Sequence, residues 1–302
     1  MSEALPRNFL GLPVAHSDPA KAAVRILPVP YEATVSYLGG TKNGPQGMID
    51  ASRAVELYDH ELDDEPFAVG VATLPEVHLT GAGPAQALRQ LRTAYAKAAK
   101  PGEGTLTIML GGEHSISGPP IQEWVERLRK QRRKLSVLQL DAHGDLREAW
   151  EGTPYSHACV MRRVCDDVNL VQVGIRAIDV AERALMRKRP KTITTIFAEE
   201  LEANEAWIDR ALDALGADVY LTIDVDYFDP SLVPSTGTPE PGGGQWYPTL
   251  RLLRRLFAER RVVAADVVEL APIPGMAAPD FLCAKLVYKL IGYWKHGRAA
   301  AR

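Results

Sequence analysis

The sequence has few cysteines, no marked excess of charge of either sign and no long apolar run. Its three cysteines among 302 residues lack metal-binding spacing and do not suggest a disulfide framework. The formal charge of −3 lacks the basic excess that a general binder of nucleic acid or anionic membranes needs. No apolar stretch approaches the ~18 residues of a membrane helix, and the start, MSEALPRNFLGLP, lacks the basic and apolar parts of a signal peptide. We therefore expect a cytoplasmic globular protein without a nucleic-acid or membrane partner.

Two common phosphate-binding motifs are also absent from the sequence. The glycines at 242–244 lack the strand–GxGxxG–helix setting of a dinucleotide site, and no P-loop occurs.

No linker, repeat or low-complexity segment divides the chain, and the Gly/Pro-rich stretch at 230–248 is too short for an interdomain tether. The sequence thus predicts a single domain over residues 1–302, with a structured loop at 230–248 and residues 1–20 as an N-terminal arm outside the sheet.

Short apolar runs rich in Val, Ile and Leu recur along the chain and predict eight strands. The expected strands are Ala23–Val29, Phe67–Leu74, Thr105–Leu110, Leu135–Leu140, Leu170–Val173, Thr192–Ile196, Val219–Ile223 and Val262–Val268. Several show no alternation of polar and apolar residues, which is typical of parallel strands covered by helices on both faces. Amphipathic patterns predict helices at Pro84–Ala99, Ala206–Leu215, Thr249–Arg260 and Ala284–Tyr293. This alternation of strands and helices indicates an α/β fold.

Polar side chains follow three of the predicted strands. The segment DAHGD places Asp141, His143 and Asp145 at positions i, i+2 and i+4, which point the same way in an extended chain. Asp224 and Asp226 follow the apolar run YLTI with the same spacing, and His114 lies in GGEHS after TIML. In open α/β sheets, ligands bind in the crevice at the carboxyl ends of strands. We therefore expect these six side chains to meet at one edge of the sheet.

Four carboxylates and two imidazoles without thiolates favour a site for two divalent ions such as Mn²⁺. Two such ions would balance the four negative charges, which would otherwise repel one another. A pair bridged by carboxylates would also generate a hydroxide nucleophile at neutral pH. Taken alone, Asp224 could be a turn former and His114 an ordinary loop histidine. Their joint occurrence at three strand ends favours the metal site.

The three motifs and their order resemble those of the ureohydrolases, the family of arginases and agmatinases. The resemblance extends over GGEHS, DAHGD and IDVDYFDP with the following GTP, and covers nearly the whole chain from Ile26 to Tyr293. It implies a three-layer α/β/α sandwich with a mainly parallel eight-stranded sheet, an arginase/deacetylase-like fold. It also implies two Mn²⁺ ions, hydrolysis of a guanidino compound to urea and an amine, and a homo-oligomer, commonly a trimer or hexamer.

The resemblance also implies roles for individual residues. Asp141 and Asp224 would bridge the ions, His114 and Asp145 would complete one metal site, and His143 and Asp226 the other. Asp145 would accept a proton when the bridging hydroxide attacks the guanidinium carbon. His157, in YSHA, matches the family's proton-shuttling histidine, and Glu269, in VVEL, matches the carboxylate that holds the guanidinium. Without the resemblance, Glu269 could equally be a surface or helix-capping residue, and His157 would more often be a structural loop histidine.

The loops favour agmatine as substrate, giving putrescine and urea, a step of polyamine biosynthesis. Residues 151–158, EGTPYSHA, lack the Asn that precedes the shuttle histidine in arginases and resemble agmatinases, as do residues 36–45, SYLGGTKNGP. Guanidinobutyrate, guanidinopropionate, guanidine and arginine remain alternatives, since specificity lies in loops. Arg147 or Arg176 could meet a carboxylated substrate, although Arg147 is better explained as an ion-pair partner.

Three further residues and two other protein classes remain open. Trp246 and Tyr247 could wall the substrate entrance or serve in packing, and Cys159 is better explained as a small buried thiol than as a nucleophile. A two-metal phosphatase or deacetylase would also cluster Asp and His at strand ends. A metal-binding scaffold without activity is the non-enzymatic alternative.

Overall fold

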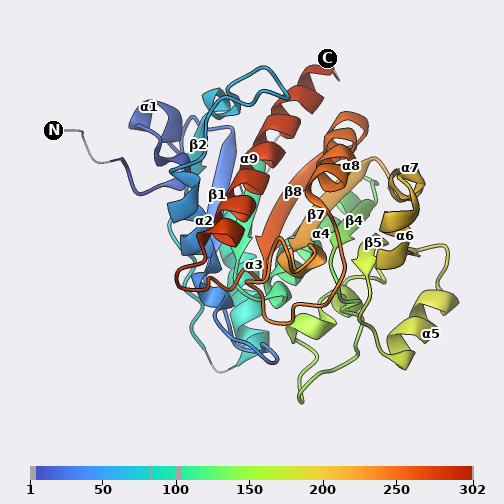
Figure 1. The fold of residues 1–302 in the computed structure, drawn as a ribbon. Helices are drawn as coiled ribbons and strands as arrows, with labels where there is room; N and C mark the ends of the chain where they lie inside the picture. The colour runs from blue at the N-terminus through green and yellow to red at the C-terminus, as the bar shows by residue number, and fades with distance from the viewer. Residues whose placement is uncertain (1–4, 82, 100–103, 301–302) are drawn as a thin grey trace.

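The computed structural model describes residues 5–81, 83–99 and 104–300, and within them one parallel sheet of eight strands forms the centre of the protein (Figure 1). The strands are β1 (Val24–Val29), β2 (Val71–Thr73), β3 (Leu106–Gly111), β4 (Leu135–Leu140), β5 (Asn169–Ile175), β6 (Ile193–Phe197), β7 (Asp218–Asp224) and β8 (Arg261–Val268). They lie in the order β2-β1-β3-β8-β7-β4-β5-β6, and every neighbouring pair is parallel.

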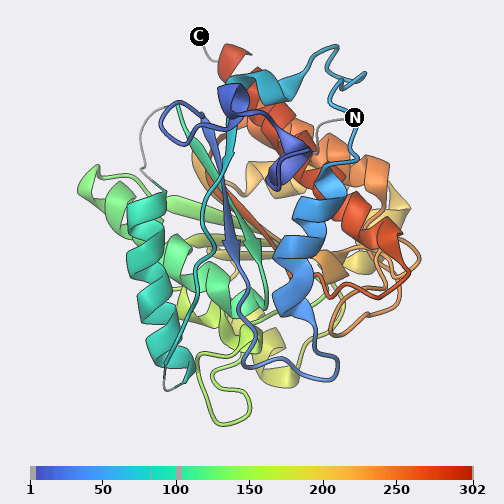
Figure 2. The ribbon, with the colours of Figure 1, turned by 90° about the vertical axis from the view of Figure 1, so that its left-hand side faces the viewer.

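Helices cover both faces of this sheet, as Figure 2 shows from one edge. The helices are α1 (Val14–Ser17), α2 (Gly44–Ser52), α3 (Pro84–Ala98), α4 (Gly118–Lys130), α5 (Val180–Lys188), α6 (Ala198–Ala203), α7 (Ala206–Asp213), α8 (Trp246–Glu259) and α9 (Ala277–Ala300). Buried side chains of α2, α7, α8 and α9 join one apolar cluster on one face, while α3, α4 and α5 cover the other. The predicted three-layer α/β/α sandwich is confirmed.

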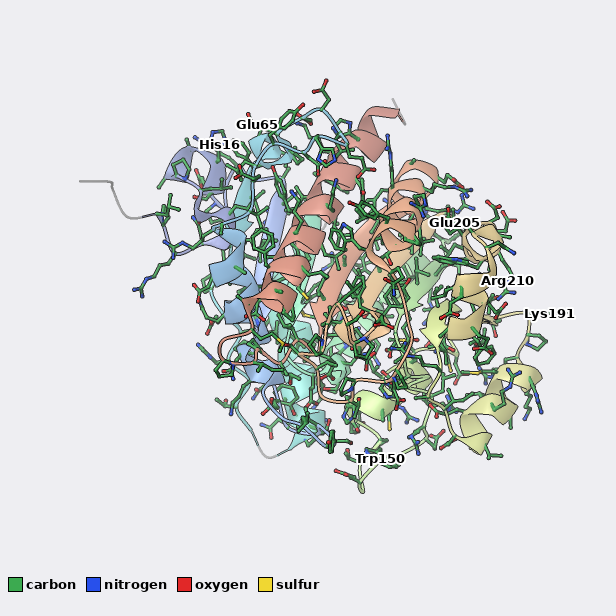
Figure 3. All side chains as sticks on the ribbon, viewed as in Figure 1. His16, Glu65, Trp150, Lys191, Glu205 and Arg210 are labelled. Atoms are coloured by element: carbon green, nitrogen blue, oxygen red, sulfur yellow. The ribbon has the colours of Figure 1, made fainter. Side chains whose placement is uncertain are left out.

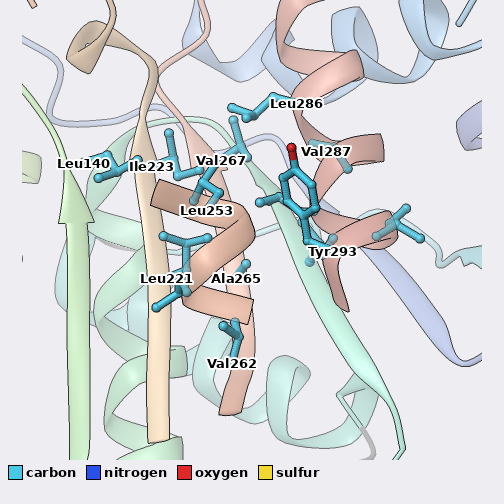
Figure 4. Packing of buried hydrophobic residues seen from close by; sticks show 14 of the residues in the cluster. Leu140, Leu221, Ile223, Leu253, Val262, Ala265, Val267, Leu286, Val287 and Tyr293 are labelled. Carbon is cyan, nitrogen blue, oxygen red and sulfur yellow. The ribbon is translucent and has the colours of Figure 1, made fainter. Parts of the chain in front are cut away.

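The largest part of the core lies between the central strands and the helices α8 and α9 (Figure 4). Leu221 of β7 and Val267 of β8 are completely buried there, beside Leu253 of α8 and Leu286 of α9. Because helices cover the strands on both faces, these strands have apolar residues in succession instead of in alternation. This explains why their positions could be predicted from short apolar runs.

Seven of the eight predicted strands agree with the described strands to within two residues at each end. The prediction for Phe67–Leu74 was wrong in its first half. Residues Pro66–Val69 form a 3-10 turn, which ends at Gly70 with φ of 79°, and only Val71–Thr73 pair with β1. A Cβ at Gly70 would come within 3.0 Å of the Cα of Ala22, so the close approach of two backbones requires glycine here.

The last helix is longer than predicted. Its ends could not be predicted from the sequence, because its middle part is buried on several sides. The sequence predicts Ala284–Tyr293, whereas α9 runs from Ala277 to Ala300. Leu286, Val287 and Leu290 are all completely buried, so no single apolar stripe marks the ends of the helix. The predicted loop at 230–248 ends earlier than expected, because α8 begins at Trp246.

The described part of the predicted N-terminal arm, residues 5–20, contains no strand and packs against the rest of the chain. Phe9 and Leu10 belong to the main apolar cluster. The backbone N–H of Phe9 donates to the Thr73 hydroxyl over 2.8 Å, and that of Leu10 donates to the Ser52 hydroxyl over 2.7 Å. The segment therefore lies outside the sheet but is attached to β2 and α2.

A buried lysine attaches α9 to the segment before β2. The Nζ atom of Lys289 lies 2.7 Å from Asp59 Oδ1 and 2.8 Å from Glu61 Oε2, and only 4% of the lysine is exposed. Tyr293 also donates to Glu61 over 2.8 Å. Although α9 is long, none of the helices in the described residues is long and apolar enough to cross a membrane.

Candidate metal centre

The polar motifs follow four strands that are neighbours in the middle of the sheet. His114 follows β3, Glu269 follows β8, Asp224 ends β7 and Asp141 follows β4, and these strands lie in the order β3-β8-β7-β4. Their carboxyl ends therefore meet at one edge, although the residues are far apart in the sequence. Strand order thus explains the clustering that the motifs predict.

The first group of candidate ligands surrounds the Nδ1 atom of His114. Carboxylate oxygens of Asp141, Asp145 and Asp224 lie 3.1, 2.9 and 3.3 Å from this nitrogen. Neighbouring ligands of a six-coordinate ion with bonds of about 2.1 Å are also about 3 Å apart. His114 and the three aspartates are nearly completely buried. This group contains the four residues predicted for one metal site.

The second group surrounds the Nδ1 atom of His143. This nitrogen lies 2.8 Å from Asp226 Oδ2 and 3.7 Å from Asp141 Oδ1. Asp141 therefore directs one oxygen toward each histidine, as a bridging carboxylate would. The candidate ligand atoms in each of two sets, His114 with Asp141 and Asp224, and Asp141 with His143 and Asp226, lie within 4.8 Å of one another. The bridging role of Asp224 stays a prediction.

An unpaired buried nitrogen shows that the first group suits a cation. The Nδ1 atom of His114 is buried and has no hydrogen-bond partner among the described residues, although three carboxylates surround it. A lone pair directed toward a point shared with three carboxylate oxygens fits a metal ion in the middle. The donor set of carboxylates and imidazoles without thiolates matches Mn²⁺ in kind.

The carboxylates influence one another strongly in this buried cluster. Burial and the charge of Asp141 raise the pKa of Asp145 to about 7, and burial with the charge of Asp226 raises the pKa of Asp224 well above its usual range. Burial disfavours the charged form of His143, but the carboxylates of Asp226 and Asp141 outweigh it and raise its pKa to about 12. The cluster therefore favours binding of positive charge.

Thr222 and Asp266, which the sequence motifs did not reveal, fix the side of His114 that faces away from the carboxylate group around Nδ1. The Nε2 atom of His114 lies 2.9 Å from Thr222 Oγ1, and the Thr222 hydroxyl donates to Asp266 Oδ1 over 2.6 Å. The Tyr220 hydroxyl donates to the other oxygen of Asp266 over 2.7 Å. Asp266 is completely buried in β8. A charged residue inside the apolar run VVAADVV was the only sequence signal for it.

Glu269 lies at the pocket in a strained backbone conformation. Its φ is 65°, which non-glycine residues rarely adopt, and Asp145 shares this feature with a φ of 52°. The Glu269 carboxylate accepts a hydrogen bond from the His114 backbone N–H over 2.6 Å. Burial raises the pKa of Glu269 well above its usual value. This geometry directs a carboxylate into the pocket next to the candidate ligand cluster.

His157 begins a short turn and contacts the loop before α2. Its Nε2 atom lies 3.4 Å from Ser36 Oγ, and its backbone N–H donates to Thr34 Oγ1 over 3.1 Å. Burial lowers the pKa of His157 below its usual value. The Nε1 atom of Trp150 also donates to Ser36 over 2.9 Å, so Ser36 connects the two loops. Figure 3 places Trp150 at the bottom of the molecule, at the end where the strand arrows point in Figure 1.

Glu113, within GGEHS, is a further residue to which the sequence gave no role. It is completely buried, and one carboxylate oxygen accepts from the backbone N–H groups of Ala33 and Thr34, both over 2.6 Å. The other oxygen accepts from the Thr34 hydroxyl over 2.7 Å. Glu113 thereby holds the loop that contacts His157. Its place beside His114 in the motif was the signal that could have indicated it.

One pocket joins most of the predicted site residues. The residues that line it come from six parts of the chain and are Val35, Ser36, His143, Asp145, His157, Asp224, Asp226, Thr236, Gly237, Thr238 and Glu269. His114 and Asp141 lie behind this surface and are completely or nearly completely buried. The structure therefore brings all eight predicted site residues together, but their catalytic and metal-binding roles stay predictions.

Neither arginine proposed for a carboxylated substrate is free in the structure. Arg147 pairs with Asp179 over 3.0 Å, and its guanidinium lies 4.4 Å above the Trp150 ring. Arg176 donates to the backbone carbonyl oxygens of Asp226 over 2.7 Å and Glu240 over 3.0 Å. Both guanidinium groups therefore stabilise the loops around the site.

The two aromatic residues after the triple glycine do not line the pocket. Trp246 instead lines a surface groove together with Phe281 of α9, and Tyr247 is 70% exposed. A packing role therefore explains Trp246 better than a role at the entrance. Cys159 is completely buried, and burial raises its thiol pKa to about 11, as expected for an inert cysteine.

Known proteins resemble this chain over nearly its full length. A family model described as "Arginase family" matches residues 22–292. An N(1)-aminopropylagmatine ureohydrolase of a Synechocystis species is 39% identical, covering 96% of this chain and 94% of its own. One from Thermus thermophilus is 37% identical, covering 90% of each chain. The crystal structure of agmatine ureohydrolase of Thermoplasma volcanium has a TM-score of 0.82 at 26% identity, covering 97% of this chain and 96% of that one.

Proposed function

The chain belongs to the arginase family, and we propose that it hydrolyses the guanidino group of a guanidinoalkyl amine to give urea and the corresponding amine. The family and the names of its relatives support an amidinohydrolase. Among the possible substrates we place N(1)-aminopropylagmatine first, because two relatives that are 39% and 37% identical carry this name. Loss of urea from this compound would leave a triamine.

Agmatine, which would give putrescine, is the second candidate. The similarity to the agmatine ureohydrolase structure of Thermoplasma volcanium favours it, as do the loop sequences around Ser36 and His157. Both candidates have the same guanidinobutyl half, so the same pocket could act on either. The proposal therefore concerns a class of substrate with a cationic distal end.

We further propose that the cluster holds two Mn²⁺ ions. His114, Asp141, Asp145 and Asp224 would hold one ion, and His143, Asp226 and the shared Asp141 and Asp224 the other. The ions would supply a nucleophile by lowering the pKa of bound water toward neutrality. The unpaired Nδ1 atom of His114 among three carboxylates supports this assignment.

The remaining residues would bind the guanidinium and move protons. A guanidinium is planar and cationic, and a carboxylate such as Glu269 can accept two parallel hydrogen bonds from it. Asp145 lies at the metal cluster, where it can take a proton from the nucleophile. His157 can deliver a proton to the departing amine, because burial lowers the pKa of its imidazole and the protonated ring therefore releases its proton readily.

The meeting of both candidate ligand groups with Glu269 in one pocket carries this proposal. Its test measures urea released by the manganese-loaded protein from N(1)-aminopropylagmatine, agmatine, arginine, guanidinobutyrate, guanidinopropionate and guanidine. We expect the first two compounds to be the best substrates. His143→Ala should abolish most of the activity, whereas His60→Ala, an exposed residue outside the pocket, should not change it.

Other outcomes of this experiment would contradict the proposal. Full activity of His143→Ala after chelation would exclude the metal-dependent reaction. Release of phosphate from phosphate esters without urea from any guanidine would indicate a two-metal phosphatase. Purified protein without stoichiometric metal and without activity would favour a scaffold.

A further inference from the structure

Glu240 lies beside His143, just outside the residues that line the acidic pocket. Its Oε1 atom lies 4.0 Å from His143 Nε2, on the opposite side of the imidazole from the candidate metal-binding nitrogen Nδ1. The Glu240 side chain is 40% exposed, so water reaches it. Thr236, Gly237 and Thr238, a few residues earlier on the same loop, line the pocket itself. Glu240 therefore lies next to His143 Nε2, whereas the candidate ligand Asp226 lies next to His143 Nδ1.

The backbone around Glu240 is fixed relative to the metal cluster. The same Nη2 atom of Arg176 donates to the carbonyl oxygen of Asp226 over 2.7 Å and to that of Glu240 over 3.0 Å. A Cβ at Gly243 would lie 2.5 Å from the carbonyl oxygen of Tyr227 and 2.9 Å from Arg176 Nη2, so the loop packs closely here. The carboxylate of Glu240 is thus presented from a rigid position, which lowers the entropic cost of binding a charged group.

No basic side chain in the described residues neutralises this carboxylate. The ion pairs among them give Glu240 no lysine or arginine partner within 4.0 Å, and no lysine or arginine is among the residues that line the pocket. Arg176 lies nearby but directs its donors to backbone carbonyls, and Arg147 is engaged by Asp179 and Trp150. The outer part of the pocket therefore suits a cation and disfavours a carboxylate.

We propose that Glu240 binds the ammonium group at the end of the butyl chain and so selects cationic guanidinoalkyl amines against guanidino acids. The inference rests on the proposed function. In agmatine this nitrogen is a primary ammonium, and in N(1)-aminopropylagmatine it is a secondary ammonium that continues into the aminopropyl group. Both can donate to a carboxylate. Glu240 thus accounts for the preference for a cation, while the rest of the aminopropyl group extends beyond it.

Orientation of His143 is the competing role for Glu240. Carboxylates often accept a hydrogen bond from the second nitrogen of a metal-ligating histidine. The separation of 4.0 Å between Glu240 and His143 Nε2 is too long for a hydrogen bond. An orienting residue would affect metal binding and every substrate, whereas a substrate-binding residue affects only ligands that carry the distal charge.

The test compares Glu240→Gln with the wild-type, manganese-loaded enzyme. We expect the KM for agmatine to rise about tenfold or more, as for loss of a charge-assisted hydrogen bond. The inhibition constant of n-butylguanidine, which has the same chain but ends in a methyl group, should stay unchanged, as should bound manganese. Glu240→Lys should lower the KM for guanidinobutyrate relative to agmatine. Glu202→Gln, an exposed glutamate on α6, is the matched control and should leave both constants unchanged.

Each other result overturns the inference. An unchanged KM for agmatine in Glu240→Gln would show that Glu240 does not bind the substrate, while wild-type urea release would leave the proposed function intact. A loss of manganese, or an equal weakening of n-butylguanidine, would assign Glu240 to the orientation of His143. A wild-type protein that releases no urea from any cationic guanidine would overturn the proposed function and this inference together.

Discussion

The two ring nitrogens of His114 contact different groups. Its Nδ1 atom lies 2.9 Å from Asp145 Oδ2, and its Nε2 atom lies 2.9 Å from the Thr222 hydroxyl. Thr222 in turn donates to Asp266 over 2.6 Å. With Asp266 fixing the direction of the Thr222 proton, the hydroxyl oxygen is left to accept from Nε2–H. This leaves Nδ1 as the free lone pair, which is the tautomer that a metal ligand requires.

Thr222→Val should therefore weaken metal binding while leaving the shape of the core nearly unchanged. Loss of such a supporting hydrogen bond costs about 10- to 100-fold in metal affinity. The affinity for Mn²⁺ can be measured by titration of the metal-free protein. Thr194→Val on the edge strand β6 is the control and should bind as the wild type. Unchanged Mn²⁺ affinity in Thr222→Val would refute a role of Thr222 in orienting His114.

His157→Asn should lower kcat without removing metal. A positioned general acid or base contributes about 10²- to 10⁴-fold to the rate. The short distances between candidate ligands join His114 and His143 to aspartates and do not include His157, so the metal should stay bound. Urea release and manganese content, measured on the same sample, check both parts of the prediction. A variant that has lost its metal along with its activity would show that His157 acts through the structure of the cluster.

Lys289→Met should destabilise the fold without touching the pocket. The substitution leaves the nearly completely buried Asp59 without its cation, and removal of one partner of a buried pair costs about 3 to 5 kcal/mol. The free energy of unfolding can be measured with a chemical denaturant. Lys188→Met on the exposed side of α5 should change it by less than about 0.5 kcal/mol. Equal stability of the two variants would contradict the importance of this pair.

Protonation of Glu61 should lower the free energy of unfolding at acidic pH. Burial alone would raise the pKa of Glu61, but hydrogen bonds from Lys289 and Tyr293 outweigh it and lower the pKa below the usual value. Its contribution is therefore complete above the unfolded-state pKa of about 4.3 and is lost as the pH falls through the lower folded-state pKa. Unfolding free energies of wild type and Glu61→Gln between pH 7 and pH 3 test this. The wild type should lose more stability than the variant in this range, and parallel curves would refute the assignment.

The sequence predicted the fold and the candidate site best where local patterns coincide with tertiary structure. DAHGD and DVD have the spacing of an extended chain and directly follow buried strands, so the clustering of Asp141, His143 and Asp226 could be inferred. Thr222 and Asp266 could not, because an inward polar side chain in a strand is not distinguishable from a random interruption of an apolar run. Glu240 needed the structure as well, since only the path of the loop brings it beside His143.

Metal binding should depend on folding of the whole sheet, because neighbouring central strands are far apart along the chain. β3 pairs with β8, and β7 with β4, so more than half of the chain must be assembled before His114, Asp141, Asp224 and Glu269 can meet. Such non-local pairings form late, because their loop-closure entropy is lost before their contacts are made. A ligand that binds only the assembled state stabilises it by mass action. Metal binding would therefore indicate that the sheet is completely assembled. The midpoint temperature of thermal unfolding should rise as the manganese concentration rises.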